Sequence, residues 1–453
     1  MQLITQGLNF PTSLAFDRKG TTYVAESGLP FGGARGGGRI LRLERDGGAT
    51  CLLDNLRQPV NGLTYHEGWL YISEGGYHGR ISRLSVEGEW RTVLDGLPGS
   101  GNYHTNMVAV GPDGKLYFSQ GAMTNSGIVG LDAYDIGWLK RLPHTSDIPG
   151  YDIVLTGVNI TTRNPLASNG DGMVETGAFS DFGRKTEAGQ RIAARVPCTA
   201  AVLRCNPDGS ELELFAWGLR NVYGLGFTPD GRLLATDQGA DDRGSRPIGN
   251  APDLLFEVRK GRWYGWPDFV GGVPVTDPSL LPESGDAPRF LLANHAELPA
   301  PEEPLLTFPA HCAAVKFAGA PHNTGRWAGH IFVALFGDET PMTGPDALSQ
   351  GRCLARIDPT NWSLHSLSSG LFARPIDVQF HPLDGGMYVL DFGAFEIDAK
   401  KAVVAQAGTG KLWRIALEET GISSARSQER RDLKPERCEH VRVNRGYPES
   451  LES

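Results

Sequence analysis

The chain has 453 residues, 40% of them hydrophobic, and a formal net charge of −9. No apolar run approaches the roughly 18 residues that a membrane-spanning helix requires, and no run or stripe of Lys and Arg would neutralise nucleic acid phosphates. The composition therefore predicts a soluble protein with no membrane span and no nucleic acid partner. The 59 Gly and 30 Pro residues favour tight turns over long helices, so an all-β fold is expected.

The cysteines and the first residues carry little functional signal. Six cysteines are scattered along the chain without CxxC spacing, which indicates neither a zinc site nor a disulfide framework. The opening MQLITQGLNFP lacks the basic and apolar segments of a signal peptide. We therefore expect a cytoplasmic protein as written, or a periplasmic or secreted one if this is a mature form.

One hairpin pattern recurs along the chain. An apolar residue is followed two positions later by another, then by a turn and a second strand. The copies begin at Leu14, Leu63, Val108, Leu225, Val315 and Val378. Each is followed by a third strand of the GRILRL type and a weaker fourth strand. The repeat predicts a six-bladed β-propeller of four-stranded blades over residues 1–417.

The N-terminus fits the same scheme. LITQGL, at residues 3–8, matches the fourth-strand phrases but has no blade before it. We expect it to form the outer strand of blade six, which closes the ring and removes an exposed sheet edge.

Uneven spacing between the copies locates the insertions. The largest covers residues 122–199 inside blade three and is either a lid or rim over a functional face or a decorative loop. A second covers residues 261–304, and its aromatic residues Trp263 and Tyr264 either wall a pocket or pack the loop onto the blade. Residues 418–453 are highly charged with few large apolar residues, which predicts a disordered tail.

The loops that lead into the innermost strands should gather at one mouth of the central channel. We call these six segments, each of which immediately precedes the innermost strand of a blade, the approach loops. Polar residues occur in or next to them at His104, Arg220, Asn221, His311, Arg374, Asn61, Asn106 and Asp377. Any single Asn in such a loop also has a structural interpretation, because its side chain can cap a turn. The cluster as a whole predicts a polar site on a rigid scaffold.

The residue types favour acid–base chemistry. His104 is the natural general base, since its ordinary pKa lies near neutrality. Arg220 keeps its proton and would stabilise negative charge that develops on an oxygen, while Asn221 would orient the ligand between them. No Ser or Cys nucleophile motif and no phosphate-binding glycine loop is found in this context. The pattern predicts proton abstraction beside an electrophilic carbonyl.

Three stretches resemble a known family: YHTNMVAVGPDGKLYFSQG, LRNVYGLGFTPDGRLLATDQGADDRGSRP and RWYGWPDF. They are similar to the glucose/sorbosone dehydrogenases, six-bladed quinoproteins that carry pyrroloquinoline quinone (PQQ) and calcium. FPAHCAAVKFAG and ARPIDV look like the sorbosone-type branch.

The resemblance implies a sugar or aldose substrate, a separate electron acceptor, and roles for particular residues. His104 would remove the substrate hydroxyl proton, and hydride would pass to the quinone carbonyl that Arg220 and Asn221 contact. Calcium would bind the loop at Gly239, Ala240 and Asp241, largely through backbone carbonyls, as a Lewis acid on the quinone.

The chain also departs from the family pattern. Tyr103 precedes the base where relatives have Asp, and FGDETPMTG stands where sorbosone-type relatives have a His-Gly-Ser-Trp-like phrase. The family binds the carboxylates of the cofactor with a Lys and a pair of Arg, for which Lys316 and Arg374 are the candidates here. Substrate contacts are expected from Asn61, Asn106, His311, Trp263 and Tyr264.

Two other functions stay open at this point. Six-bladed propellers also include metal-dependent lactonases, and Asn61, Asn106, Asn221 and Asp377 could supply oxygen ligands for calcium in such an enzyme. A non-catalytic binding propeller is the other alternative.

Overall fold

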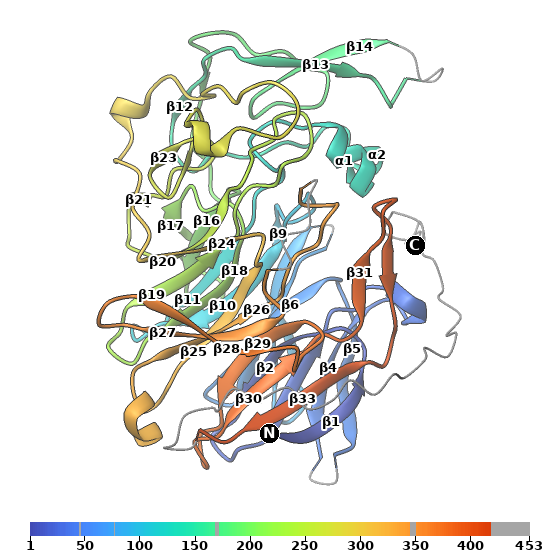
Figure 1. Ribbon diagram of the computed structural model, residues 1–453, viewed down its shortest axis with the longest axis vertical. Coiled ribbons are helices and arrows are strands. Elements are labelled where there is room, and N and C mark those ends of the chain that lie inside the picture. The colour runs from blue at the N-terminus through green and yellow to red at the C-terminus, as the bar shows by residue number, and fades with distance from the viewer. Residues whose placement is uncertain (45–46, 77, 168–171, 345–349, 418–453) are drawn as a thin grey trace.

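The computed structural model describes residues 1–44, 47–76, 78–167, 172–344 and 350–417. Within these residues, six antiparallel sheets stand around a central axis as a six-bladed β-propeller, which confirms the fold expected from the repeat (Figure 1). The charged segment 418–453, predicted to be a disordered tail, lies outside the described residues.

The first three blades follow the chain. Blade one consists of β2 (Pro11–Phe16), β3 (Thr22–Glu26), β4 (Gly38–Leu43) and β5 (Ala49–Leu56). Blade two consists of β6 (Val60–His66), β7 (Trp69–Glu74), β8 (Gly79–Ser85) and β9 (Trp90–Leu97). Blade three consists of β10 (Thr105–Val110), β11 (Leu116–Gln120), β16 (Ala201–Cys205) and β17 (Glu213–Trp217), with β21 (Arg262–Trp263) added in parallel to β17.

The last three blades complete the ring. Blade four consists of β18 (Val222–Phe227), β19 (Leu233–Asp237), β20 (Pro252–Glu257) and β24 (Leu306–Ala310). Blade five consists of β25 (Ala314–Gly319), β26 (Ile331–Leu335), β27 (Cys353–Asp358) and β28 (Ser363–Ser369). Blade six consists of β29 (Pro375–Phe380), β30 (Met387–Asp391), β33 (Gly410–Ile415) and β1 (Gln2–Leu8).

The N-terminal strand closes the ring as predicted. β1 pairs antiparallel with β33, with Leu3 opposite Trp413 and Leu8 opposite Gly410. Figure 1 shows β1 beside β33 in the lower part of the molecule. The first and last parts of the propeller therefore share one sheet, and the outer edge of β33 is paired rather than open.

Core packing follows from the two-residue period of the strands. On β7, Leu70 and Ile72 pack into a cluster with Ala25 and other residues of blade one. Tyr71, between them, packs against Val108 of blade three. Because successive side chains of a strand point to opposite faces, each inner strand contributes to two cores, and the apolar interior lies between neighbouring blades.

Carboxylates at the ends of the second strands hold the approach loops. The side chain of Glu26 accepts a hydrogen bond from the Asn9 N–H at 2.7 Å, and Glu74 accepts one from the Arg57 N–H at 2.8 Å. Asp237 and Asp391 do the same in blades four and six, as described below. In blade three this position is Gln120, which accepts from the Thr105 hydroxyl at 2.9 Å instead.

The large insertion, residues 122–199, lies between β11 and β16 and stands at the upper end of the molecule in Figure 1. It contains two helices and four short strands: α1 (Leu131–Ile136), α2 (Trp138–Arg141), β12 (Ile153–Val154), β13 (Asn159–Arg163), β14 (Met173–Gly177) and β15 (Arg191–Ile192). The hairpin of β31 (Phe395–Ile397) and β32 (Val403–Ala405) in blade six lies below α1 and α2 on the right of Figure 1.

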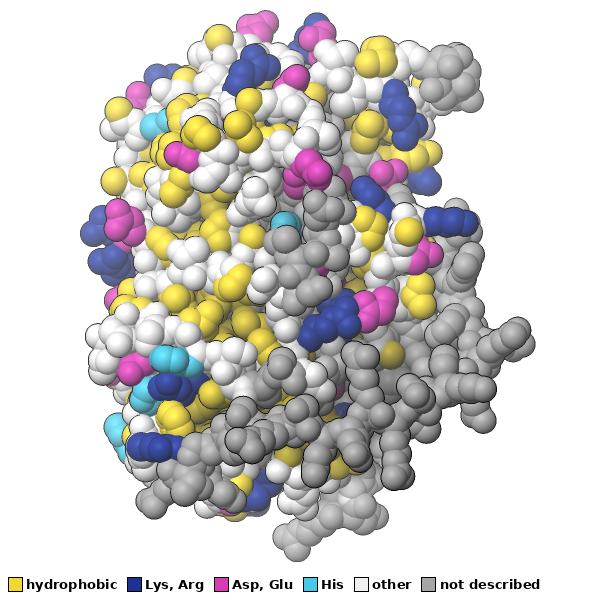
Figure 2. Space-filling model, in the orientation of Figure 1, with side chains coloured by type: hydrophobic (Ala, Val, Ile, Leu, Met, Phe, Trp, Pro, Cys, Tyr) yellow, Lys and Arg dark blue, Asp and Glu magenta, His cyan; other side chains and the backbone are white. Residues whose placement is uncertain are grey.

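The remaining short elements lie in loops: β22 (Phe269–Val270), β23 (Val273–Pro274) and the 3₁₀ turns η1 (Phe31–Gly33), η2 (Pro278–Leu280), η3 (His295–Glu297) and η4 (His322–Trp327). On the face shown in Figure 2, Lys and Arg side chains are interspersed with Asp and Glu rather than gathered into a patch of one sign. Among the described helices, none has the length and apolar character needed to cross a membrane.

Candidate active site

The approach loops border a cavity of about 850 Å³ at one mouth of the channel. Helix α1, η1 and the β31–β32 hairpin complete its rim, so part of the 122–199 insertion lines the cavity. The structure brings six of the polar residues predicted in or next to the approach loops to its wall: Asn61, His104, Asn106, Arg220, Asn221 and His311. Gly239 and Asp241 of the predicted calcium loop line it as well. A cavity of this size accommodates a cofactor-sized ligand.

His104 immediately precedes β10, and backbone groups fix its ring. Its Nδ1 lies 2.7 Å from the Gly99 carbonyl oxygen, which can only accept, so Nδ1 carries a proton, and a backbone group of Gly75 also hydrogen-bonds the side chain. Gly75 allows this close packing, since a Cβ there would lie 2.6 Å from His104 Cβ. Burial lowers the pKa of His104 and favours the neutral form that a general base needs.

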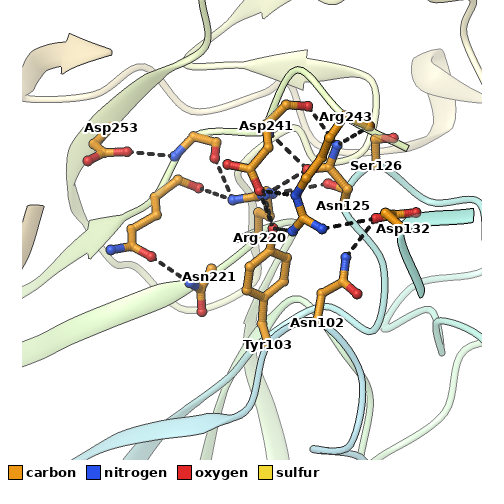
Figure 3. Close-up of polar contacts among 12 residues, drawn as sticks. Asn102, Tyr103, Asn125, Ser126, Asp132, Arg220, Asn221, Asp241, Arg243 and Asp253 are labelled. Carbon is orange, nitrogen blue, oxygen red and sulfur yellow. Dashed lines mark hydrogen bonds and ion pairs between the residues drawn. The ribbon is translucent and has the colours of Figure 1, made fainter. Parts of the chain in front are cut away.

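Arg220 is held by its backbone and by its side chain. Its N–H and that of Asn221 donate to the Asp237 carboxylate at 3.1 and 2.6 Å. Figure 3 shows the guanidinium at the centre of a polar cluster. Each of its nitrogens donates to the protein, and the partners are the Asn125 carbonyl and amide oxygens, the Gln238 and Gly239 carbonyls, the Tyr103 hydroxyl and the Asp241 carboxylate. Arg220 therefore organises the wall of the cavity as well as facing it.

Arg243, Tyr103 and Asp132 also line the cavity, although the sequence patterns did not single out Arg243 or Asp132. Arg243 Nε donates to Asp241 at 2.9 Å, and its two terminal nitrogens lie 3.3 Å from Asp132 and from the Tyr103 hydroxyl (Figure 3). Asp132 comes from α1, inside the insertion, where no repeat places it. Two arginines and two aspartates thus alternate around Tyr103, and their charges balance.

The predicted asparagines form a chain of amide hydrogen bonds. Asn61 donates to Asn106 at 3.0 Å, Asn106 to Asn221 at 2.7 Å, and Asn221 to the Gln238 side chain at 2.7 Å. The acceptor oxygens of Asn106 and Asn221 are thereby bonded to neighbouring amides.

Asp377, the fourth ligand of the lactonase alternative, is turned away from these amides. It accepts from the Leu14 N–H at 2.7 Å and from the Ser13 hydroxyl at 3.3 Å, and it does not line the cavity. This arrangement does not favour a calcium ion held by Asn61, Asn106, Asn221 and Asp377.

Lys316 and Arg374, the predicted partners of cofactor carboxylates, are not among the residues that line the cavity. Lys316 Nζ donates to the Thr12 and Asn61 carbonyls, and burial lowers its pKa to about 8. The Arg374 guanidinium donates to the carbonyls of Gly337 and Asp338 at 2.9 and 2.8 Å. Backbone carbonyls thus hold both cations behind the wall.

Trp263 and Tyr264 do not reach the cavity either. Trp263 is fully buried and stacks on Trp217 with ring centroids 6.5 Å apart. Tyr264 packs edge-on against Phe256, and its hydroxyl donates to the Glu257 carbonyl at 2.7 Å. Of the two alternatives for these aromatics, the structure has the second: they pack the loop onto the blades.

The loop predicted to hold calcium is occupied by protein contacts. The Gly239 carbonyl accepts from the Arg220 guanidinium, and the Asp241 carboxylate accepts from Arg220 and Arg243. Ala240 is buried and does not line the cavity. No group of three or more His, Cys, Asp or Glu in the described ranges is arranged to hold a metal. A divalent cation does not fit beside two guanidinium groups, which repel it.

Comparison with known proteins finds one relevant sequence relative and many similar folds. Quinoprotein glucose dehydrogenase B of Acinetobacter calcoaceticus is 24% identical over 181 residues, which are 40% of this chain and 29% of that protein. The chain therefore spans less than a third of the curated relative it matches, and no family model matches it.

The PQQ-bound aldose sugar dehydrogenase of Streptomyces coelicolor is 17% identical with a TM-score of 0.55, and covers 91% of this chain and 96% of its own. The apo-form aldose sugar dehydrogenase of Escherichia coli is 14% identical with a TM-score of 0.51, and covers 91% and 98%. The sequence match confirms the resemblance to the quinoprotein sugar dehydrogenases, and the solved structures show the shared fold.

Proposed function

We propose that the protein is a quinoprotein dehydrogenase that oxidises a hydroxyl group of a sugar or aldose. The observation that carries this proposal is that His104, whose Nδ1 is held by the Gly99 carbonyl, shares one cavity with Arg220 and Asn221 of the neighbouring blade. The resemblance to quinoprotein glucose dehydrogenase supports the reaction type. The partners would be a small sugar and a separate electron acceptor.

The cavity fits PQQ in size and less well in charge. A volume of about 850 Å³ leaves room for a flat cofactor together with a monosaccharide. Arg243 is the lining cation best placed to meet a carboxylate, because two of its contacts are long, at 3.3 Å. When bound, PQQ would supply the hydride acceptor. Calcium at Gly239–Asp241 does not fit this chain, because Arg220 and Arg243 already bond the acceptor groups of that loop.

The residues of the chain divide the remaining work. His104 would take the proton of the sugar hydroxyl, with Nδ1 held by Gly99 so that the ring keeps its orientation. The amide chain of Asn106 and Asn221 gives the same wall a fixed set of polar atoms for orienting hydroxyl groups. The aromatic side chains of Phe392 and Phe395 line the cavity as well and exclude water from part of it.

Reconstitution tests the proposal directly. Purified protein is titrated with PQQ, with and without calcium, and aldoses and a dye acceptor are then added. We expect a change in the quinone spectrum on binding and sugar-dependent dye reduction. The absence of both in every arm would rule the dehydrogenase out.

His104→Gln tests the assigned base. Loss of a general base lowers turnover by roughly 10²-fold or more, whereas quinone uptake should be unchanged. Activity of the unmodified protein should decline only at pH values below the ordinary histidine range, because burial lowers the pKa of His104. His144→Gln, at an exposed loop position, is the matched control and should leave turnover unchanged. Equal turnover of both variants would remove His104 from the mechanism.

A further inference from the structure

Glu339 is a carboxylate that lines the cavity and that neither the sequence patterns nor the proposed reaction uses. It lies in the loop after β26, within the FGDETPMTG phrase that departs from the sorbosone-type relatives. Its side chain makes no hydrogen bond or ion pair with any residue that the structure describes.

Other carboxylates at the cavity are bonded. Asp132 accepts from Asn102 at 3.0 Å and from Arg243, and Asp241 accepts from both arginines. Asp253 accepts from the backbone N–H groups of Gly239 and Ala314 at 2.9 and 2.6 Å. Glu339 differs from these three because no residue in the described part of the chain donates to its carboxylate.

The cations around Glu339 are committed elsewhere. Arg374, whose charge acts most strongly on it, donates to Gly337, Asp338 and Phe395 carbonyls at 2.8 to 3.0 Å. Arg243 is shared between Asp241 and Asp132. Burial raises the pKa of Glu339, and the negative charges of Asp241 and Asp338 nearby act in the same direction.

A partly desolvated carboxylate without a partner is costly unless a ligand supplies a hydrogen-bond donor or a positive charge. We propose that Glu339 sets the charge preference of the cavity. It accepts hydrogen bonds from hydroxyl or ammonium groups of neutral and amino sugars, and it repels sugars that carry a carboxylate. This inference names the substrate class and rests on the proposed sugar-binding function.

Binding without turnover tests it. The methyl glycosides of glucosamine, glucose and glucuronic acid share one ring and differ in charge. Their affinities for the quinone-free protein are measured by calorimetry, using unmodified protein, Glu339→Gln, and Glu339→Asp, which keeps the charge. Glu87→Gln, on an exposed turn, is the control for loss of one negative charge far from the cavity.

We expect affinity to fall from the amino sugar to glucose to the uronic acid in the unmodified protein. In Glu339→Gln, the ratio of the affinity for the amino sugar to the affinity for the uronic acid should be smaller by about tenfold or more, which corresponds to about 1.4 kcal/mol. Glu339→Asp should retain the preference in part, and Glu87→Gln in full. Since an unpaired carboxylate is removed, Glu339→Gln should melt no earlier than the unmodified protein.

An unchanged ratio in Glu339→Gln, equal affinity for the three glycosides, or no measurable binding of any of them would overturn the inference. The dehydrogenase proposal fails by a different observation, namely the absence of quinone uptake and dye reduction. A sugar-binding propeller without quinone chemistry would show the expected glycoside affinities in calorimetry but no quinone uptake or dye reduction.

Discussion

The approach loops of blades four and six anchor an arginine in the same way and send its side chain in opposite directions. The Arg220 N–H donates to Asp237 at the end of β19, and the Arg374 N–H donates to Asp391 at the end of β30, at 3.1 and 2.8 Å. The Arg220 guanidinium then forms the cavity wall, whereas that of Arg374 lies behind it. The backbone anchor fixes the loop, and the acceptors supplied by neighbouring segments decide where the side chain goes.

Replacing Arg220 should have the largest effect. Arg220→Met leaves Asp241 without one of its two guanidinium partners and breaks the contact with Tyr103 (Figure 3). Removing one partner of a buried ion pair costs about 3–5 kcal/mol. We expect a loss of this order in the free energy of unfolding from urea titration, together with loss of ligand binding. Stability within about 1 kcal/mol of the unmodified protein would contradict the central role of this residue.

Arg374→Met should separate stability from the site. Several buried carbonyls lose their donor, at about 1–3 kcal/mol for a buried group left unsatisfied, so unfolding should be easier. Because Arg374 does not line the cavity, the affinity for quinone should be unchanged in the folded fraction. A selective loss of quinone affinity would instead return Arg374 to the cofactor-binding set that the family resemblance implies.

The carboxylates that anchor the two loops give an effect that is specific to pH. Burial raises the pKa of Asp237 from 3.8 to about 7. The folded state then binds this proton more tightly than the unfolded state, so stability should fall as the pH rises from about 4 to about 7 and level off above it. Asp237→Asn should flatten this dependence in urea titrations across that range. Asp391→Asn serves as the control. If it flattens the pH dependence of stability as much as Asp237→Asn does, this dependence does not come from Asp237.

Most of the fold could be predicted from the sequence because the strands have a two-residue period. Leu70, Tyr71 and Ile72 alternate between two cores because a strand has a two-residue period, and that period is visible without coordinates. The closing strand was also predictable, since residues 3–8 repeat the outer-strand phrase.

The site was predictable only where the repeat places it. His104 and Asn221 occupy matching positions in their approach loops, with Arg220 next to Asn221, and all three line one cavity. Asp132 and Glu339 lie in an insertion and an irregular loop, which no periodicity positions. Residue type alone also could not show that backbone carbonyls capture Lys316 and Arg374, because those acceptors come from other blades.

Two blades depart from the anchoring scheme: the second strand of blade five ends in Leu335, and the departure in blade three bears on the base itself. Where blades one, two, four and six have a carboxylate at the end of the second strand, blade three has the neutral Gln120 beneath the loop of His104. A carboxylate in that place would stabilise the imidazolium and raise the pKa of the histidine. With an amide there, no full charge at this position opposes the lowering of the His104 pKa by burial. The break in the repeat is thus an electrostatic condition for acid–base chemistry in this blade.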